Sequence, residues 1–197
     1  MRTAWGYDVT GGEVSPILSV NDFNAMTGNI YVNNPRVESA LKAASQAIRN
    51  YCGWHISPSL SCTAEPEGGG QVLRLPATYV SAISGIIEDG TELESTAYQW
   101  RKDGLIKRAF SQWWSDKWGG ISVSYTAGYT VNAVPDLAEA VCAITAGVLA
   151  VSAGVISESA DGVSISYSQS ASSIAAGLTS QQKSALNPYK VVNSHAA

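Results

Sequence analysis

The chain has 197 residues, 45% of them hydrophobic, so it is long enough to bury a core and too apolar to be a disordered protein. Only 14% of the residues are charged, against about a quarter in typical soluble proteins, which predicts a surface that is either covered by partners or rich in Ser, Thr, Asn and Gly. The net charge of −4 and the scattered Lys and Arg residues argue against DNA binding, because a phosphate-binding surface needs clustered positive charge.

The cysteines indicate the compartment in which the chain is made, and its apolar runs indicate whether it enters a membrane. Cys52, Cys62 and Cys142 cannot all pair within one chain, and the first residues do not resemble a secretory leader. We therefore expect synthesis in a cytoplasm, with the thiols reduced. The run 138–156 is rich in alanine and interrupted by polar residues, so we predict a buried core helix there and no membrane span.

The first part of the chain is predicted as an arm followed by two helices. Residues 1–18 contain several glycines and little periodicity, and are predicted to form an extended N-terminal arm. A short helix is expected over 21–27 and a long one over 35–52. Asn34 precedes the long helix as a cap, and Gly53 follows it as a left-handed stop.

The long helix has one apolar face. Its apolar residues recur at spacings of three and four: Val37, Ala40, Leu41, Ala44, Ile48 and Tyr51. Glu38 lies four residues before Lys42, which favours an ion pair on the opposite face. This pattern indicates packing, and we interpret the exit at 51–56 as a hinge into the next part of the chain.

Residues 56–130 change to the two-residue period of strands. Ile121, Val123 and Tyr125 alternate with polar neighbours, which is typical of a strand with one buried face. Asp89-Gly90 and Lys102-Asp103-Gly104 are hairpin turn signals. We expect the charged pairs 101–102 and 107–108 to flank the second turn as solvated charges. Glu88 and Asp89 are expected to belong to the first turn, where Asp supports the backbone.

A second long helix is predicted over 136–153, opened by Pro135, and its small residues would let a neighbouring helix approach closely. The tail 154–197 contains a strand pattern and a short helix whose capping box is Thr179 with Gln182. The predicted fold class is α+β: a helical core of two long helices plus short helices, an inserted small antiparallel β-sheet, and extended termini. Residues 19–153 are expected to form the main domain.

The usual catalytic signatures do not occur in this sequence. It contains no phosphate-binding loop, HExxH, CxxC or GxGxxG motif. The stretch 150–154 superficially resembles a nucleophile elbow around Ser152, but a helix leads into it where a strand is required. Cys52, His55 and Cys62 could be imagined as metal ligands, although their spacing matches no zinc module. We predict no enzyme, no catalytic residue, no cofactor and no metal.

Aromatic residues are concentrated in the second half of the strand region. Five lie within 19 positions: Trp100, Phe110, Trp113, Trp114 and Trp118. If residues 113 and 114 are extended, their side chains point to opposite faces; if the segment is helical, most of the aromatics share one face. Core packing and an interface role both fit, since aromatics dominate interface hot spots. For the interface role we add Tyr167 and Tyr189 from the tail.

The order of these elements resembles the head–tail connector proteins (adaptor or head-completion proteins) of long-tailed phages and prophages. The resemblance covers roughly residues 19–153. Its segments are Val20-Asn21-Asp22-Phe23, Thr27-Gly28, Tyr51-Cys52-Gly53-Trp54-His55-Ile56, Leu73-Arg74-Leu75-Pro76, Gly104-Leu105-Ile106 with Arg108, Tyr125-Thr126-Ala127-Gly128-Tyr129 and Pro135-Asp136-Leu137. The Gly-rich arm and the Ser-rich tail depart from the family pattern.

The resemblance implies a structural protein of the virion neck, made in the cytoplasm of a bacterial host. Such adaptors form a ring, commonly of twelve copies, under the portal protein, and the ring extends the DNA channel toward a stopper or tail-completion protein. DNA then passes through the lumen without sequence-specific binding, and no membrane is involved. Two alternatives stay open: a stopper or tail-side joining protein of the same neck, and, from a different class, a small hydrolase or ligand-binding domain.

Overall fold

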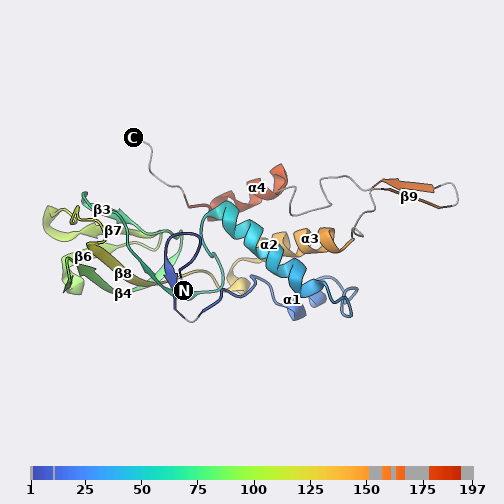
Figure 1. The fold of residues 1–197 in the computed structure, drawn as a ribbon, viewed down its shortest axis with the longest axis horizontal. Helices are drawn as coiled ribbons and strands as arrows, with labels where there is room; N and C mark the ends of the chain where they lie inside the picture. The colour runs from blue at the N-terminus through green and yellow to red at the C-terminus, as the bar shows by residue number, and fades with distance from the viewer. Residues whose placement is uncertain (1, 11, 151–156, 161–162, 167–177, 192–197) are drawn as a thin grey trace. The chain divides into compact units, whose positions relative to one another are not determined.

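The computed structural model describes residues 2–10, 12–150, 157–160, 163–166 and 178–191 (Figure 1). The backbone divides into two compact units. The first, which we call the strand unit, consists of Met1–Val14, Cys52–Thr130 and Tyr189–Ala197. The second, the helical unit, consists of Ser15–Tyr51 and Val131–Pro188.

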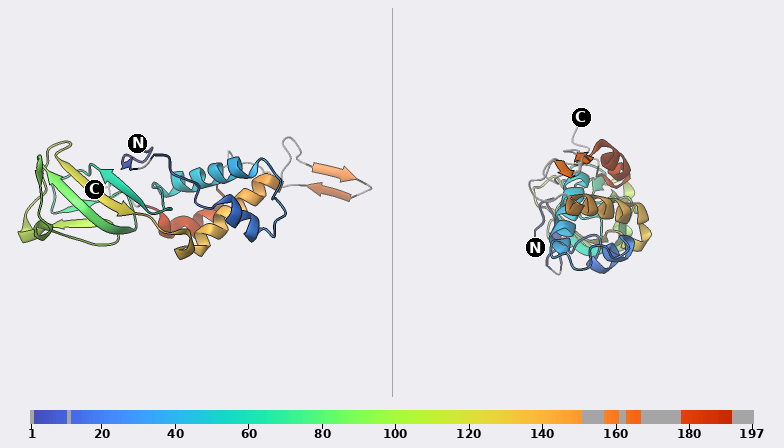
Figure 2. Two further views of the ribbon diagram at one scale, coloured as in Figure 1. Left: turned by 90° about the horizontal axis from the view of Figure 1, so that it is seen from below. Right: turned by 90° about the vertical axis from the view of Figure 1, so that its right-hand side faces the viewer.

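Two antiparallel sheets form the strand unit. The larger has the strand order β1-β2-β8-β4-β5 and the smaller the order β3-β7-β6. Their bounds are β1 Asp8–Val9, β2 Leu60–Ala64, β3 Val72–Arg74, β4 Val80–Glu88, β5 Thr91–Glu92, β6 Tyr98–Trp100, β7 Leu105–Arg108 and β8 Ile121–Ala127. The longest strands, β4 and β8, lie side by side (Figure 2).

Strand β8 shows why this sequence forms a sheet with one buried face. Ile121, Val123 and Tyr125 are each no more than 1% exposed, while the intervening serines are half-buried. This confirms the predicted alternation. The turn between β4 and β5 is Asp89-Gly90, with φ of +49° and +80°, as the turn signal predicted.

The described residues of the helical unit are mostly helical. The helix bounds are α1 Val20–Met26, α2 Val37–Cys52, α3 Pro135–Ala150 and α4 Ser180–Leu186. A separate hairpin of β9 Ser157–Ala160 and β10 Val163–Ser166 lies between α3 and α4 in the sequence. Short 3₁₀ turns occur at Ser95–Ala97, Ala109–Ser111, Val131–Ala133 and Asn187–Tyr189 across the two units. The capping box of Thr179 with Gln182 and the Glu38–Lys42 ion pair at 2.9 Å are present as predicted. Among the described residues, no helix is long and apolar enough to cross a membrane.

The predicted fold class was wrong. No two long helices form a core: α3 packs mainly on α4 and on the turn Val131–Ala133, and the eight strands of the two sheets form a core of their own. The small residues of α3 had suggested close approach of a second long helix. Part of α2 instead covers the segment that precedes α1, because Ser45 and Arg49 hydrogen-bond to its backbone at Ile17 and Ser15.

The first residues do not form the free extended arm that was predicted, and the end of the chain also has a partner in the strand unit. Strand β1 pairs with β2 at the edge of the larger sheet, and Tyr7 and Val9 are 1% and 3% exposed. At the other end, the N–H of Val191 donates to the carbonyl of Cys52 over 2.9 Å. The backbone groups of both ends therefore have partners in the strand unit, which local sequence patterns do not reveal.

Both ends meet at residues 54 and 55. The hydroxyl of Tyr7 accepts a hydrogen bond from the backbone N–H of His55 at 2.9 Å and lies 2.8 Å from Nδ1 of the His55 ring. Nε2 of the same ring lies 2.9 Å from the carbonyl of Ala127. Because a carbonyl only accepts, Nε2 carries the proton and Nδ1 accepts from Tyr7. The indole N–H of Trp54 donates to the carbonyl of Tyr189 at 2.6 Å. The exit at 51–56 is thus a buried junction of both ends of the strand unit.

Candidate assembly surface

The structure separates the predicted aromatic residues into exposed and packed ones. Phe110, Trp113 and Trp118 are 87%, 68% and 90% exposed. Trp114 is 2% exposed, and Tyr189 is buried against Tyr129 at the junction of the ends. Trp100 is half-buried on β6, and Tyr167 lies outside the described residues. The exposed three all belong to residues 109–118, which we call the aromatic loop.

The conformation of the aromatic loop decides between the two predicted arrangements. After the 3₁₀ turn Ala109–Ser111 the chain is extended, and the adjacent Trp113 and Trp114 point outward and inward. This is the alternation of an extended chain. Trp114 therefore anchors the loop in the strand unit, and its neighbour is presented to solvent.

Backbone hydrogen bonds tie the aromatic loop to residues 69–71. The N–H of Trp114 donates to the carbonyl of Gly70 at 2.8 Å, and the N–H of Gly69 returns a bond to Trp114 at 3.1 Å. The side-chain amide of Gln71 donates to the carbonyl of Ser111. The neighbouring Gly68 is required by close approach, since a Cβ there would collide with the carbonyl of Ser115 and lie 2.7 Å from Cδ1 of Ile121. The loop is therefore held at both sides of Trp113.

A largely buried ion pair supports the same loop from beneath. Nη2 of Arg108 lies 2.8 Å from Oε2 of Glu88, and the two side chains are 13% and 12% exposed. Oε1 of Glu88 accepts the N–H of Ser115 at 2.8 Å, and Nη1 of Arg108 donates to the carbonyl of Ala97 at 3.0 Å. The guanidinium also lies 5.2 Å from the ring centroid of Trp114. Both charges have structural roles, so the prediction of a solvated Arg108 was wrong. Glu88 flanks the Asp89-Gly90 turn as predicted, and its carboxylate also supports the aromatic loop.

Backbone strain coincides with the exposed aromatics. Phe110 and Ser111 have φ of +54° and +56°, a region that non-glycine residues adopt at a cost of about 1–3 kcal/mol each. The strained Phe110 ring points into water, so its burial within this chain does not offset that cost. Strain combined with an exposed apolar side chain on a supported loop is typical of a preorganised contact site.

Removing the charge of Glu88 is expected to loosen the aromatic loop. In the Glu88→Gln variant Arg108 loses its counter-charge in a poorly hydrated site, which we expect to lower the free energy of unfolding by about 2 kcal/mol. Urea unfolding measures that loss, and hydrogen exchange at the Ser115 amide reports local opening. The exposed Glu65→Gln is the control and should change neither quantity. Unchanged exchange at Ser115 in Glu88→Gln would contradict a supporting role for the pair.

The histidine and cysteine side chains that could bind a metal are buried, and the histidine ring is hydrogen-bonded. Both ring nitrogens of His55 are within hydrogen-bond distance of Tyr7 and Ala127, so metal ligation would break those bonds. Burial raises the pKa of the Cys52 and Cys62 thiols to about 12, which keeps both protonated near neutral pH, where metal binding requires thiolates. No cluster of three metal-ligating side chains occurs among the described residues. Ser152 lies outside them.

Comparison with known proteins adds a family and a set of similar folds. The family described as HCP, head completion protein, matches residues 16–192. A chain in the neck of an empty GTA particle, computed with C6 symmetry, is 18% identical with a TM-score of 0.60, over 96% of this chain and 98% of that one. A chain in the virion of a native gene transfer agent (GTA) particle is 16% identical with a TM-score of 0.63, over 97% and 98%. One in the neck of a native GTA particle, computed with C12 symmetry, is 16% identical with a TM-score of 0.57, over 94% and 99%. No protein of curated function matches.

Proposed function

This chain belongs to the head completion protein family, and from that premise we propose that copies of it form a ring under the portal that joins the DNA-filled head to the tail. Family membership confirms the resemblance found in the sequence. It also confirms the structural head–tail connector role in the virion neck that the resemblance implied. The ring, its copy number, its partners and the absence of a catalytic activity are the proposal.

The symmetry of solved necks that contain chains of similar fold supports the proposed ring. Solved GTA necks that contain chains of similar fold were computed with C6 and C12 symmetry, which suits a ring of twelve copies. Copies related by rotation make head-to-tail contacts, and each copy then offers two different surfaces to its neighbours. A net charge of −4 disfavours sticking to DNA phosphates, so an acidic lumen would let DNA pass.

The aromatic loop is the observation that carries the assembly role. Phe110, Trp113 and Trp118 are large exposed apolar side chains on a supported loop. Because preorganised aromatic anchors lose little conformational entropy on binding, they suit a permanent contact with another neck protein. We therefore assign the contact with the stopper or tail-completion protein to this loop, within the predicted main domain 19–153.

Particles made without this protein test the proposed function. We expect DNA-filled heads without tails when the gene is deleted, and tailed particles again when purified chain is added to those heads. Electron microscopy counts both kinds of particle, and chain that has been heat-unfolded before addition is the control. Normal tailed particles without the protein would overturn the proposal. A reconstruction of the neck then locates the ring, and density on the tail side alone would identify a tail-side joining protein instead.

A further inference from the structure

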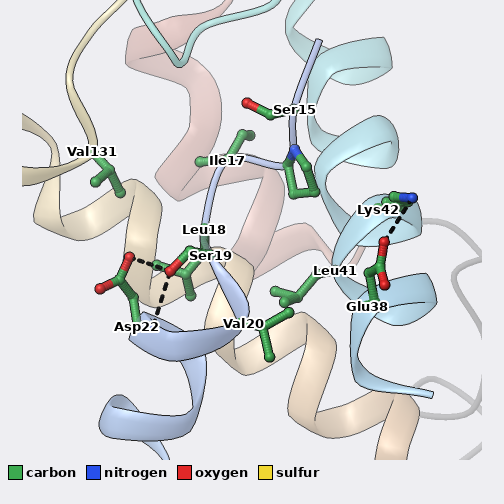
Figure 3. Close-up of a pocket in the computed structure, with 11 residues that line it drawn as sticks. Ser15, Ile17, Leu18, Ser19, Val20, Asp22, Glu38, Leu41, Lys42 and Val131 are labelled. Atoms are coloured by element: carbon green, nitrogen blue, oxygen red, sulfur yellow. Dashed lines mark hydrogen bonds and ion pairs between the residues drawn. The ribbon is translucent and has the colours of Figure 1, made fainter. Parts of the chain in front are cut away.

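A groove of about 370 Å³ lies in the helical unit, between the segment Ser15–Val20 and the first turns of α2 (Figure 3). Its apolar lining comes from the side chains of Pro16, Ile17, Leu18, Val20, Leu41 and Val131. The volume is at the lower end of the roughly 300–1,000 Å³ of ligand sites, so the groove suits a few side chains of a peptide segment.

The wall of the groove is fixed by buried hydrogen bonds. The N–H of Ile17 donates to Oγ of Ser45 at 3.0 Å, and Nη2 of Arg49 donates to the carbonyl of Ser15 at 2.6 Å. Ser45 is fully buried and Arg49 is 3% exposed. Buried polar contacts of this kind hold an extended segment in one conformation. The groove therefore exists before anything binds to it.

The rim of the groove has an excess of negative charge. Asp22 lies on one side, where Oδ2 accepts from the hydroxyl of Ser19 at 2.6 Å (Figure 3). Glu38 and Lys42 lie on the α2 side and form an exposed ion pair at 2.9 Å. Asp22 thus lies on one side of the apolar floor and the paired Glu38 and Lys42 lie on the other, so the rim carries two carboxylates and one ammonium group. A ligand that complements this pattern is apolar in the middle and basic at its ends.

We propose that this groove binds a segment of a neighbouring protein in which aliphatic side chains are flanked by lysine or arginine. The aliphatic side chains enter between Val20 and Leu41, and the basic ones approach Asp22 and Glu38. The two carboxylates at the rim, Asp22 and Glu38, favour a basic partner segment.

Peptide binding to the full-length chain tests this groove. The probe is the acetylated and amidated tetrapeptide Lys-Leu-Leu-Lys, titrated into ¹⁵N-labelled protein. We expect saturable shifts of the backbone amides of Val20, Glu38 and Leu41, and weaker binding as salt is raised. The peptides Glu-Leu-Leu-Glu and Lys-Ser-Ser-Lys separate the charge and apolar requirements, and neither should saturate the site. Equal binding of all three peptides, or no shift with Lys-Leu-Leu-Lys, would overturn the proposal.

Two variants locate the bound peptide. Glu38→Gln should weaken Lys-Leu-Leu-Lys by about twofold to fivefold, as expected for a partly exposed ion pair. Val20→Trp fills the groove from a partly exposed position and should abolish the shifts, with an otherwise unchanged spectrum as evidence of folding. Glu94→Gln removes the same charge from an exposed site of the strand unit and should bind as the wild type does. Equal affinity of Val20→Trp and wild type would place the peptide elsewhere and refute the groove.

Discussion

A chain carrying Phe110→Ala, Trp113→Ala and Trp118→Ala is expected to fold as stably as the wild type and to fail to join heads to tails. The side chains are mostly exposed, so their removal takes almost no buried apolar area from the strand unit. An aromatic hot spot contributes about 2 kcal/mol or more to an interface, equivalent to roughly thirtyfold in affinity. Losing all three should lower the affinity of each contact by more than a hundredfold. The measurements are thermal unfolding and the tailed fraction of particles in electron micrographs.

The matched control for the triple variant removes exposed apolar side chains from the helical unit. Ile30 and Val32 are 74% and 54% exposed, and Ile30→Ala with Val32→Ala should leave the tailed fraction unchanged. If the control loses tails as completely as the triple variant does, exposed apolar area in general matters and the aromatic loop has no special role. If the triple variant assembles normally, the loop is not an interface.

Gly128→Ala is expected to cause a large loss of stability. Gly128 has φ of +108°, and a Cβ would collide with the carbonyl of Pro58 and lie 2.7 Å from Nε2 of His55. The substitution therefore strains the backbone and pushes His55 from its bond with Ala127. We expect a loss of about 3–5 kcal/mol, which lowers the melting temperature by about 10 °C in a chain of this size.

Gly70→Ala is the control for that prediction. A Cβ at Gly70 has ordinary contacts, the nearest at 3.9 Å, and Gly70 does not have a positive φ. Its melting temperature should stay close to that of the wild type. Calorimetry of both variants separates the effect of a tight junction from the general cost of replacing a glycine. Equal melting temperatures would show that the junction around His55 tolerates an added methyl group.

Local patterns predicted the elements of this protein well. Helix α2, strand β8, the Asp89-Gly90 turn and the capping box of Thr179 with Gln182 all occur where the sequence indicated. Each depends on spacing within a few residues, which propensity, periodicity and capping report directly. The order of these elements was also sufficient to indicate the family, because it is a property of the sequence alone.

Contacts between distant residues could not be predicted in the same way. Arg108 and Glu88 are 20 residues apart, Tyr7 and His55 are 48 apart, and Trp54 and Tyr189 are 135 apart. Each residue alone has several plausible partners, and only the packed strand unit selects one of them. The helical core was predicted wrongly for the same reason: an apolar helix face shows that something is buried, but not what covers it.

For the aromatic residues the sequence determined their concentration, and the tertiary structure decided their roles. The sequence alone does not show which of Trp113 and Trp114 is buried. The extended backbone beside residues 69–71 turns one indole outward and the other under Arg108. Composition and periodicity are fixed by the chain itself, whereas burial depends on which surfaces come together when it folds. The sequence thus determined that this protein has aromatic side chains for a core and for a contact surface, and folding assigned each residue to one of them.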